Sequence, residues 1–262
     1  MKPAPFAYVR AESLDEVIAA LAEHEDAKVL AGGQSLVPAL NMRVLRPALL
    51  VDINRVPGLD EVVEHGTLCV GTTVRQADPR LLVHPLLAAV LPHVGHTVTR
   101  NRGTVGGSIA HADAAAELPL ALLLCGGSAT VASGRGRREI RGEELFLGPY
   151  TTALAPDELL VETTWPALRE GEGFAFDELT QRRGDYALCM AAARVRDADV
   201  RVVVGSVTPT PTLLEVDPER PGDSAAEQVE PWGSVHASPE YLRHLVCVLV
   251  DRVVARAREQ AA

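Results

Sequence analysis

Two short glycine loops hold the residues best suited to bind an anion. Each loop follows an apolar or strand-forming stretch and contains adjacent glycines and a hydroxyl residue. Their residues are Ala31, Gly32, Gly33, Gln34, Ser35 and Leu36 in the first loop, and Gly103, Thr104, Val105, Gly106, Gly107 and Ser108 in the second. Adjacent glycines reach backbone angles closed to other residues, so consecutive N–H groups can point toward one place. Such a concavity binds anions, and a pair of them could hold both phosphates of a dinucleotide.

Neither loop matches the common nucleotide-binding motifs. No G-x-G-x-x-G lies between a strand and a helix, and no Walker lysine follows either loop. Taken alone, Gly32 and Gly33 favour a tight turn after a strand, and the presence of the second loop reverses this preference toward a ligand site. The sequence therefore predicts a phosphate site outside a Rossmann domain.

Charge and hydropathy limit the possible partners. The chain has 262 residues and a formal net charge of −10, which argues against nucleic acid because phosphate contacts need clustered Lys and Arg. No apolar run approaches the roughly 18 residues that span a bilayer. The Met1-Lys2-Pro3 start lacks a signal-peptide core, so we expect a soluble cytoplasmic protein without membrane contact. Backbone amides would have to attract an anionic ligand against the overall charge.

Four isolated cysteines argue against a metal site. Cys69, Cys125, Cys189 and Cys247 stand in apolar surroundings, with no C-x-x-C and no Cys/His cluster. Iron–sulfur and structural zinc sites need closely spaced ligands. We expect buried structural thiols and no bound metal.

The hydrophobic periodicity predicts an α+β chain without repeats. Strands are expected at 6–9, 28–31, 48–53, 128–133, 138–140 and 159–164, with a hairpin over 61–71. Helices are expected after the capping box at Ser13 to Glu16, and at 79–94, 114–124 and 239–258.

A domain boundary is expected where the periodicity breaks at 168–173. The boundary separates a domain over 1–170 from a smaller one over 171–262. The second domain shows three strand-like runs at 174–179, 186–195 and 200–207, then a proline-rich stretch to Pro231 and the long final helix. The apolar stripe of that helix is typical of core packing.

Three segments in this order resemble a known family. They are the first loop, the run from Arg100 to Asp113, and the run from Arg182 to Ala187, and the tail from Ala237 to Leu245 fits as well. Together they resemble the FAD-binding medium subunit of molybdenum hydroxylases, the carbon monoxide dehydrogenase and xanthine dehydrogenase flavoprotein family. The resemblance implies a two-part FAD-binding domain of the vanillyl-alcohol-oxidase (PCMH) type. A smaller C-terminal α/β domain with a three-stranded antiparallel sheet and a helix would follow it.

The resemblance also implies roles for individual residues. Residues 31–36 would wrap the diphosphate on one side, and Thr104 to Ser108 would bind it or the ribityl chain on the other. Asp113 and Glu117 match acidic positions facing sugar hydroxyls, and Leu160 matches an aliphatic contact near the adenine or flavin ring. Tyr186 matches the position that stacks on or gates the flavin ring.

Other interpretations of these residues stay open. Glu117 suits a first helical turn without any ligand, and Tyr186 suits ordinary strand packing. His111 is more typical of a structural histidine than of a general base. Asp113 and Glu117 are four apart, but nothing else in the sequence indicates a glycosidase cleft.

Two departures from the family pattern bear on function. Asp177 stands where some relatives have a lysine near the flavin, and an aspartate would oppose reduced, anionic flavin. The stretch between Val207 and His236 is shorter than usual, which leaves open the loss of a helix and an altered partner surface.

The implied function is that of an FAD-dependent oxidoreductase subunit in which the flavin carries the chemistry and no side chain is catalytic. Electrons would come from the iron–sulfur clusters of a small 2Fe–2S subunit, beside a molybdopterin-binding large subunit, and pass to NAD or another acceptor. A stand-alone flavin oxidoreductase and a degenerate scaffold without flavin are the alternatives.

Overall fold

A small parallel sheet carries the first glycine loop, in a computed structural model that describes residues 1–261. β1 (Ala7–Arg10), β3 (Leu49–Asp52) and β2 (Ala27–Leu30) lie side by side in that order. The helix α1 (Leu14–Glu23) packs against this sheet through buried apolar residues. Ser13 caps α1 by accepting a hydrogen bond from the backbone N–H of Glu16, as the sequence predicts. β2 leads into the first loop, and α2 (Leu36–Asn41) follows it.

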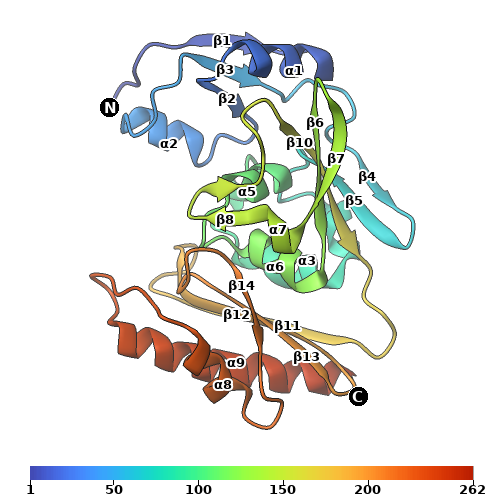
Figure 1. Ribbon diagram of the computed structural model, residues 1–262, viewed down its shortest axis with the longest axis vertical. Helices are drawn as coiled ribbons and strands as arrows, with labels where there is room; N and C mark the ends of the chain where they lie inside the picture. Colours follow the sequence, from blue (N-terminus) through green and yellow to red (C-terminus); the bar gives the residue numbers. More distant parts are fainter. Residues whose placement is uncertain (262) are drawn as a thin grey trace.

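A five-stranded antiparallel sheet forms the middle of the molecule (Figure 1). Its strands, in spatial order, are β4 (Val62–Glu64), β5 (Thr67–Gly71), β10 (Leu159–Pro166), β6 (Ser128–Ser133) and β7 (Gly136–Arg141). The predicted hairpin over 61–71 and the predicted strand pair over 128–140 are both confirmed. β10 comes late in the chain but lies at the centre, between β5 and β6.

Short helices fill the space beside this sheet. They are η1 (Pro79–Val83), α3 (Pro85–Val90), η2 (Leu91–His93), α4 (Thr97–Arg100), α5 (Val105–His111), α6 (Glu117–Cys125) and α7 (Gly142–Leu145), with the strand pair β8 (Phe146–Gly148) and β9 (Thr151–Thr152). The prediction of one helix over 79–94 is wrong. Pro79 and Pro85 each begin a new helical piece and Pro92 is the second residue of another, because proline lacks the N–H that a continuing helix needs. α6 begins at Glu117, three residues later than expected, and 112–116 is an irregular segment.

The C-terminal sheet has four antiparallel strands, so the prediction of three is wrong. They are β11 (Gly173–Thr180), β12 (Ala187–Arg196), β13 (Asp199–Gly205) and β14 (Thr212–Glu215). Pro209 and Pro211 precede β14, where their missing N–H groups leave no gap in the ladder. The stretch between Val207 and His236, where the sequence leaves open the loss of a helix, contains α8 (Pro221–Gln228). The long helix α9 (Pro239–Ala261) ends the described chain.

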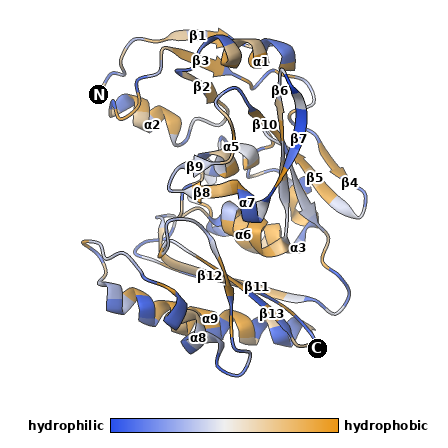
Figure 2. Cartoon of the chain, viewed as in Figure 1, coloured by the Kyte–Doolittle hydropathy of each residue, from blue (hydrophilic) through white to orange (hydrophobic). Residues whose placement is uncertain are grey.

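This C-terminal sheet lies between two helical layers (Figure 1). Alternate residues point to opposite faces, so Phe176, Met190 and Val203 join the main core beside α6. Their neighbours, such as Cys189 and Val204, pack against α9 in a separate core. Figure 2 shows the result as hydropathy: α6 is apolar along its length, whereas α9 is polar where it meets solvent.

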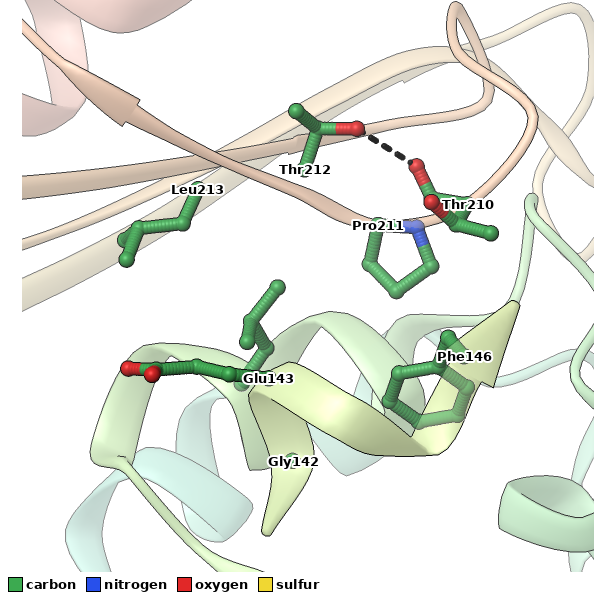
Figure 3. Close-up of a pocket in the computed structure, with 8 residues that line it drawn as sticks. Gly142, Glu143, Phe146, Thr210, Pro211, Thr212 and Leu213 are labelled. Carbon is green, nitrogen blue, oxygen red and sulfur yellow. Dashed lines mark hydrogen bonds between the residues drawn. The ribbon is translucent and has the colours of Figure 1, made fainter. Parts of the chain in front are cut away.

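A pocket of about 180 Å³ remains where the C-terminal sheet meets α6 and α7 (Figure 3). Its lining comes from both parts of the chain: Leu123, Gly142, Glu143, Phe146, Thr210, Pro211, Thr212 and Leu213. The Thr212 hydroxyl donates to the Thr210 carbonyl across its rim. Glu143 is the one charged residue in this lining, so the pocket offers no group to attract an anion.

Two further expectations concern cysteines and membranes. Cys125 and Cys189 are buried, but Cys69 and Cys247 are partly exposed, so the prediction of four buried thiols holds for two. No helix within residues 1–261 combines the length and the apolar character that a membrane crossing requires.

Candidate cofactor site

The two glycine loops lie against each other, although seventy residues separate them. A Cβ atom on Gly32 would stand 2.5 Å from the Arg102 carbonyl oxygen and 2.8 Å from the Gly103 Cα. A Cβ on Gly107 would stand 3.7 Å from that of Ala31. Close approach therefore requires glycine at position 32, and the fold brings together the two loops that the sequence singles out.

Arg75 and Asn54 brace the two loops. The Arg75 guanidinium donates to the Arg102 carbonyl beside the second loop and, over 2.6 Å, to the Asn54 side-chain oxygen. The Asn54 amide donates in turn to the carbonyls of Leu30 and Ala31, at the start of the first loop. Burial lowers the pKa of Arg75, and the nearby Arg102 cation lowers it further. The brace fixes the spacing of the loops through backbone carbonyls.

The first loop leaves its amides free. In the described residues 1–261, no backbone N–H from Gly32 to Leu36 donates to another protein group. Gly33 has φ +72°, a left-handed conformation that turns neighbouring N–H groups toward one side. Ser35 precedes α2 but makes no capping hydrogen bond, and its hydroxyl lies beside that of Tyr186. Unpaired consecutive amides are suited to hold an anion.

The second loop uses most of its amides within the protein. Val105 N–H donates to the Val74 carbonyl, Gly107 N–H to the Thr104 hydroxyl oxygen, and Ser108 N–H to the Thr104 carbonyl. Gly106 is buried, with a would-be Cβ only 1.9 Å from the Thr72 hydroxyl oxygen. The second loop is therefore mainly a packing surface, with the Ser108 side chain half-exposed beside it.

Strained backbone converges on the segment that carries Asp113. Ala112, Tyr150 and Ser206 all have positive φ (51°, 55° and 68°). Tyr150 N–H donates to the Ala112 carbonyl, and Ser206 N–H donates to the Ala114 carbonyl. The Tyr150 hydroxyl lies 3.4 Å from one Asp113 carboxylate oxygen, and Ala115 N–H donates to the other. Tyr150 and Ala115 thus hold the carboxylate, Tyr150 and Ser206 hold the backbone around it, and such strain is typical of functional sites.

Tyr186 comes to the same place from the C-terminal sheet. It is 59% exposed, yet protein surrounds it closely enough that burial raises the pKa of its hydroxyl to about 12. The carboxylates of Asp113 and Glu117 raise that pKa too, and the nearby Ser35 hydroxyl opposes the rise. Tyr186 is therefore an exposed aromatic residue close to Asp113, Glu117 and Ser35.

Glu117 is buried at the start of α6. Burial raises the pKa of its carboxyl from 4.5 to about 7, and the neighbouring Glu178 and Asp113 carboxylates act in the same direction. His111, nearby, packs against the Tyr150 ring with 5.0 Å between centroids, and burial lowers its pKa. These groups surround the same part of the fold as Asp113 and Tyr186.

Two predicted positions lie elsewhere. Leu160 is 2% exposed in the main core, so its side chain is a packing residue and any contact with a ring stays a prediction. Asp177 points away from the candidate site, toward Arg252 and Arg256 on α9. The next residue of β11, Glu178, faces the site instead, because side chains alternate along a strand.

Asn54, Arg75, Tyr150 and Glu178 take part in the site although the sequence did not indicate them. Asn54 follows β3 and Arg75 follows β5, both in irregular segments. Their roles depend on contacts across 20 or more residues, such as the 21 that separate Arg75 and Asn54. No local sequence signal marks such contacts.

Comparison with known proteins agrees with this geometry. Residues 4–168 match the family model of the FAD binding domain in molybdopterin dehydrogenase. The chain belongs to this family. Its cofactor is FAD, and the resemblance stated from the sequence is confirmed. Family members are FAD-binding subunits of oxidoreductase complexes, which agrees with the predicted enzyme class.

Individual relatives cover the whole chain. The 6-hydroxypseudooxynicotine dehydrogenase complex subunit alpha of Paenarthrobacter nicotinovorans is 38% identical over 289 residues, covering 100% of this chain and 97% of that protein. The nicotine 6-hydroxylase medium subunit of the same organism is 37% identical, with 98% and 99% covered. A solved carbon monoxide dehydrogenase chain from Hydrogenophaga pseudoflava superposes with a TM-score of 0.95 at 30% identity, and each chain is covered completely.

The residues present fit FAD. The diphosphate needs donors, and the free N–H groups from Gly32 to Leu36 are suited to supply them without lysine or arginine side chains. The open aromatic face of Tyr186 suits a flat ring system.

Proposed function

We propose that this chain is the FAD-binding electron-transfer subunit of a molybdenum hydroxylase complex, with FAD held between the glycine loops and Tyr186. The free amides of the first loop are the observation that carries the proposal. Backbone N–H groups that lose water without gaining a hydrogen-bond partner cost free energy, and a phosphate oxygen can accept their hydrogen bonds.

Each residue predicted for the site has a proposed role in binding or positioning FAD. The amides of Gly32 to Leu36 and the Ser35 hydroxyl hold the diphosphate, while the second loop, Thr104 to Ser108, packs beneath it and offers the Ser108 hydroxyl. Asp113, held by Tyr150 and Ala115, accepts hydrogen bonds from sugar hydroxyls, with Glu117 beside it. Leu160 contributes an aliphatic contact through the core. Tyr186 covers one face of the ring and excludes water there.

FAD supplies the redox chemistry when bound, and no side chain of this chain acts as a nucleophile. The partners that fit this role are a molybdopterin-binding large subunit and a small subunit with 2Fe–2S clusters, which would deliver electrons. NAD or another acceptor would receive them. The names of the relatives, a complex subunit alpha and a medium subunit, support a multi-subunit assembly.

The domain boundary at 170/171 belongs to the same proposal. The family model ends at residue 168, and β11 begins the separate four-stranded sheet at Gly173. Residues 1–170 then form the FAD-binding domain, and 171–262 form the C-terminal domain that contributes Tyr186.

Titration of the flavin-free chain with FAD, FMN and riboflavin, followed by flavin fluorescence, tests the binding mode. If the first loop holds a diphosphate, FAD binds at least about tenfold more tightly than FMN, since charge-assisted hydrogen bonds are lost with the second phosphate. Equal affinity for FAD and FMN would contradict the assignment. A chain that binds no flavin would support the degenerate-scaffold alternative.

Rapid-mixing kinetics of the FAD-loaded chain tests its dependence on partners. We expect flavin reduction when a reduced iron–sulfur partner subunit is added, and none when small organic substrates are added to the isolated chain. Turnover of an organic substrate by the isolated chain would indicate the stand-alone oxidoreductase instead.

A further inference from the structure

An ionisable cluster lies in the otherwise apolar contact between the two parts of the chain. It consists of His93 on η2, Glu178 on β11 and Glu117, the first residue of α6. His93 Nδ1 is 3.0 Å from one Glu178 carboxylate oxygen, and the ring of Phe176 packs edge-on against His93 with 5.0 Å between centroids. The other Glu178 oxygen is buried without a hydrogen-bond partner among the described residues.

The charges of this cluster do not balance. With both carboxyls ionised and His93 protonated, the net charge is −1 in a buried place, and burying an uncompensated charge is costly. Asp113 adds a further negative charge on the side of Glu117. Asp177 lies near His93 but is paired with Arg252 and Arg256 on α9. Arg194, on β12, pairs with Glu172 and acts on Cys125 at the other end of α6. Because these arginines are paired elsewhere, an additional proton on the cluster is the remaining way to reduce its negative charge.

The cluster also extends from solvent at His93 to the buried start of α6 at Glu117. The His93 side chain is 39% exposed, whereas that of Glu178 is 8% exposed and Glu117 is buried. Glu117 lies within electrostatic reach of Asp113 and of the Tyr186 hydroxyl. We infer that Glu117, Glu178 and His93 form a proton-holding site, which exchanges its proton with solvent through His93 and offsets changes of charge beside Tyr186. Its effect on bound FAD rests on the proposed function, whereas the proton-holding itself is a property of the flavin-free chain.

The pKa shifts agree with this geometry. Burial raises the pKa of Glu117 to about 7, with Glu178 and Asp113 adding to the rise and His93 opposing it. The hydrogen bond with Glu178 raises the pKa of His93, and burial opposes that rise. The folded chain thus holds a proton on Glu117 that the unfolded chain releases above its ordinary pKa of 4.5. Stability is therefore lost as the pH rises between about 4.5 and 7.

Carboxyl-labelled NMR of the flavin-free chain tests the proton-holding site. With ¹³C on the glutamate carboxyls, we expect one resonance that titrates near pH 7, absent from Glu117→Gln and shifted in midpoint in Glu178→Gln. The exposed Glu25→Gln variant is the matched control and should leave that resonance in place. If every glutamate resonance titrates below pH 5.5 in the parent chain, the proton-holding site does not exist. A resonance that persists unchanged in both cluster variants would overturn it equally.

The pH dependence of the FAD midpoint potential tests the link to the cofactor. In the loaded chain, Glu117→Gln should make the potential less steeply dependent on pH between 6 and 8, and Glu25→Gln should not. An unchanged slope in Glu117→Gln overturns the link. Absence of FAD binding by the parent chain would overturn the proposed function, and the NMR titration of the flavin-free chain would still decide the proton-holding site.

Discussion

The two glycine loops look alike in sequence but differ in what they offer. The first presents the unpaired N–H groups of Gly32 to Leu36, whereas the second donates the N–H groups of Val105, Gly107 and Ser108 to protein acceptors. Glycine is also required for different reasons. Gly33 needs a left-handed conformation, whereas Gly106 has no positive φ and is crowded by Thr72. Similar motifs in one site can thus differ in role: one loop offers unpaired donors, and the other packs within the protein.

The largest effect is expected for the supporting loop. Gly106→Ala would place a Cβ 1.9 Å from the Thr72 hydroxyl oxygen and 2.6 Å from the Thr72 Cα, so α5 must move away from backbone that cannot yield. We expect a loss of about 3 kcal/mol in the free energy of unfolding, measured by urea denaturation. Gly134→Ala, which meets nothing within 4 Å, is the control. Equal stability of the two variants would show that the crowding at Gly106 is relieved without cost.

A smaller effect is expected where the loops touch. Gly32→Ala would press a Cβ against the Arg102 carbonyl oxygen and the Gly103 Cα, both backbone atoms. We expect about 2 kcal/mol lower stability and at least about tenfold weaker FAD binding, because the first loop must swing away from the second. Gly148→Ala, with only an ordinary contact to Thr151, serves as the control for both measurements. Unaltered FAD affinity would mean that the contact between the loops does not set the site.

Variants at two glycines separate the effect of the Gly33 backbone conformation from the effect of its position in the candidate site. Gly33→Ala should cost about 1 kcal/mol, since φ +72° disfavours a Cβ, and Gly33→Asn should cost less because asparagine tolerates this region. Gly58 has φ +81° in open space, so Gly58→Ala imposes similar strain outside the site. We expect calorimetric binding to show weaker FAD affinity only for the change at Gly33. The same loss in both variants would point to general destabilisation.

The smallest effects distinguish the two hydroxyls that precede α2 and α5. Thr104 accepts a hydrogen bond from Gly107 N–H, so Thr104→Val should lower stability by about 1 kcal/mol. Ser35 makes no capping bond, so Ser35→Ala should change stability by less than about 0.5 kcal/mol but weaken FAD binding. Thermal unfolding with and without FAD separates the two quantities. Reversed results would exchange the roles of the two loops.

Local chemistry explains what the sequence could predict. Paired glycines beside a hydroxyl residue are recognisable without any tertiary contact, so the sequence predicts both loops. Alternating apolar and polar residues predict the hairpins in the same way. The strand β14 was missed because Pro209 and Pro211 suggested irregular structure, although both precede the ladder. Only the pairing with β13 shows that Thr212 begins a strand.

One register step separates two neighbouring acidic residues on β11. The resemblance drew attention to Asp177, whose side chain lies against Arg252 on α9, whereas the Glu178 side chain lies on the other face of the sheet and contacts His93. A shift of one residue changes the face of a sheet, and no local pattern fixes it when both neighbours are acidic. The hydrogen bond from Arg75 to Asn54 could not be predicted from the sequence either, because it depends on how two sheets pack together.

The position of β10 has a consequence for how the protein is made. This strand joins β5 to β6, yet it is synthesised only at residues 159–166, long after both glycine loops have left the ribosome. Until then the five-stranded sheet lacks its central strand, and Thr72 lacks the Val161 carbonyl to which its N–H donates. Tyr186 follows later still. A nascent chain halted before residue 159 should therefore bind no flavin, and cofactor capture should be a late, nearly post-translational event.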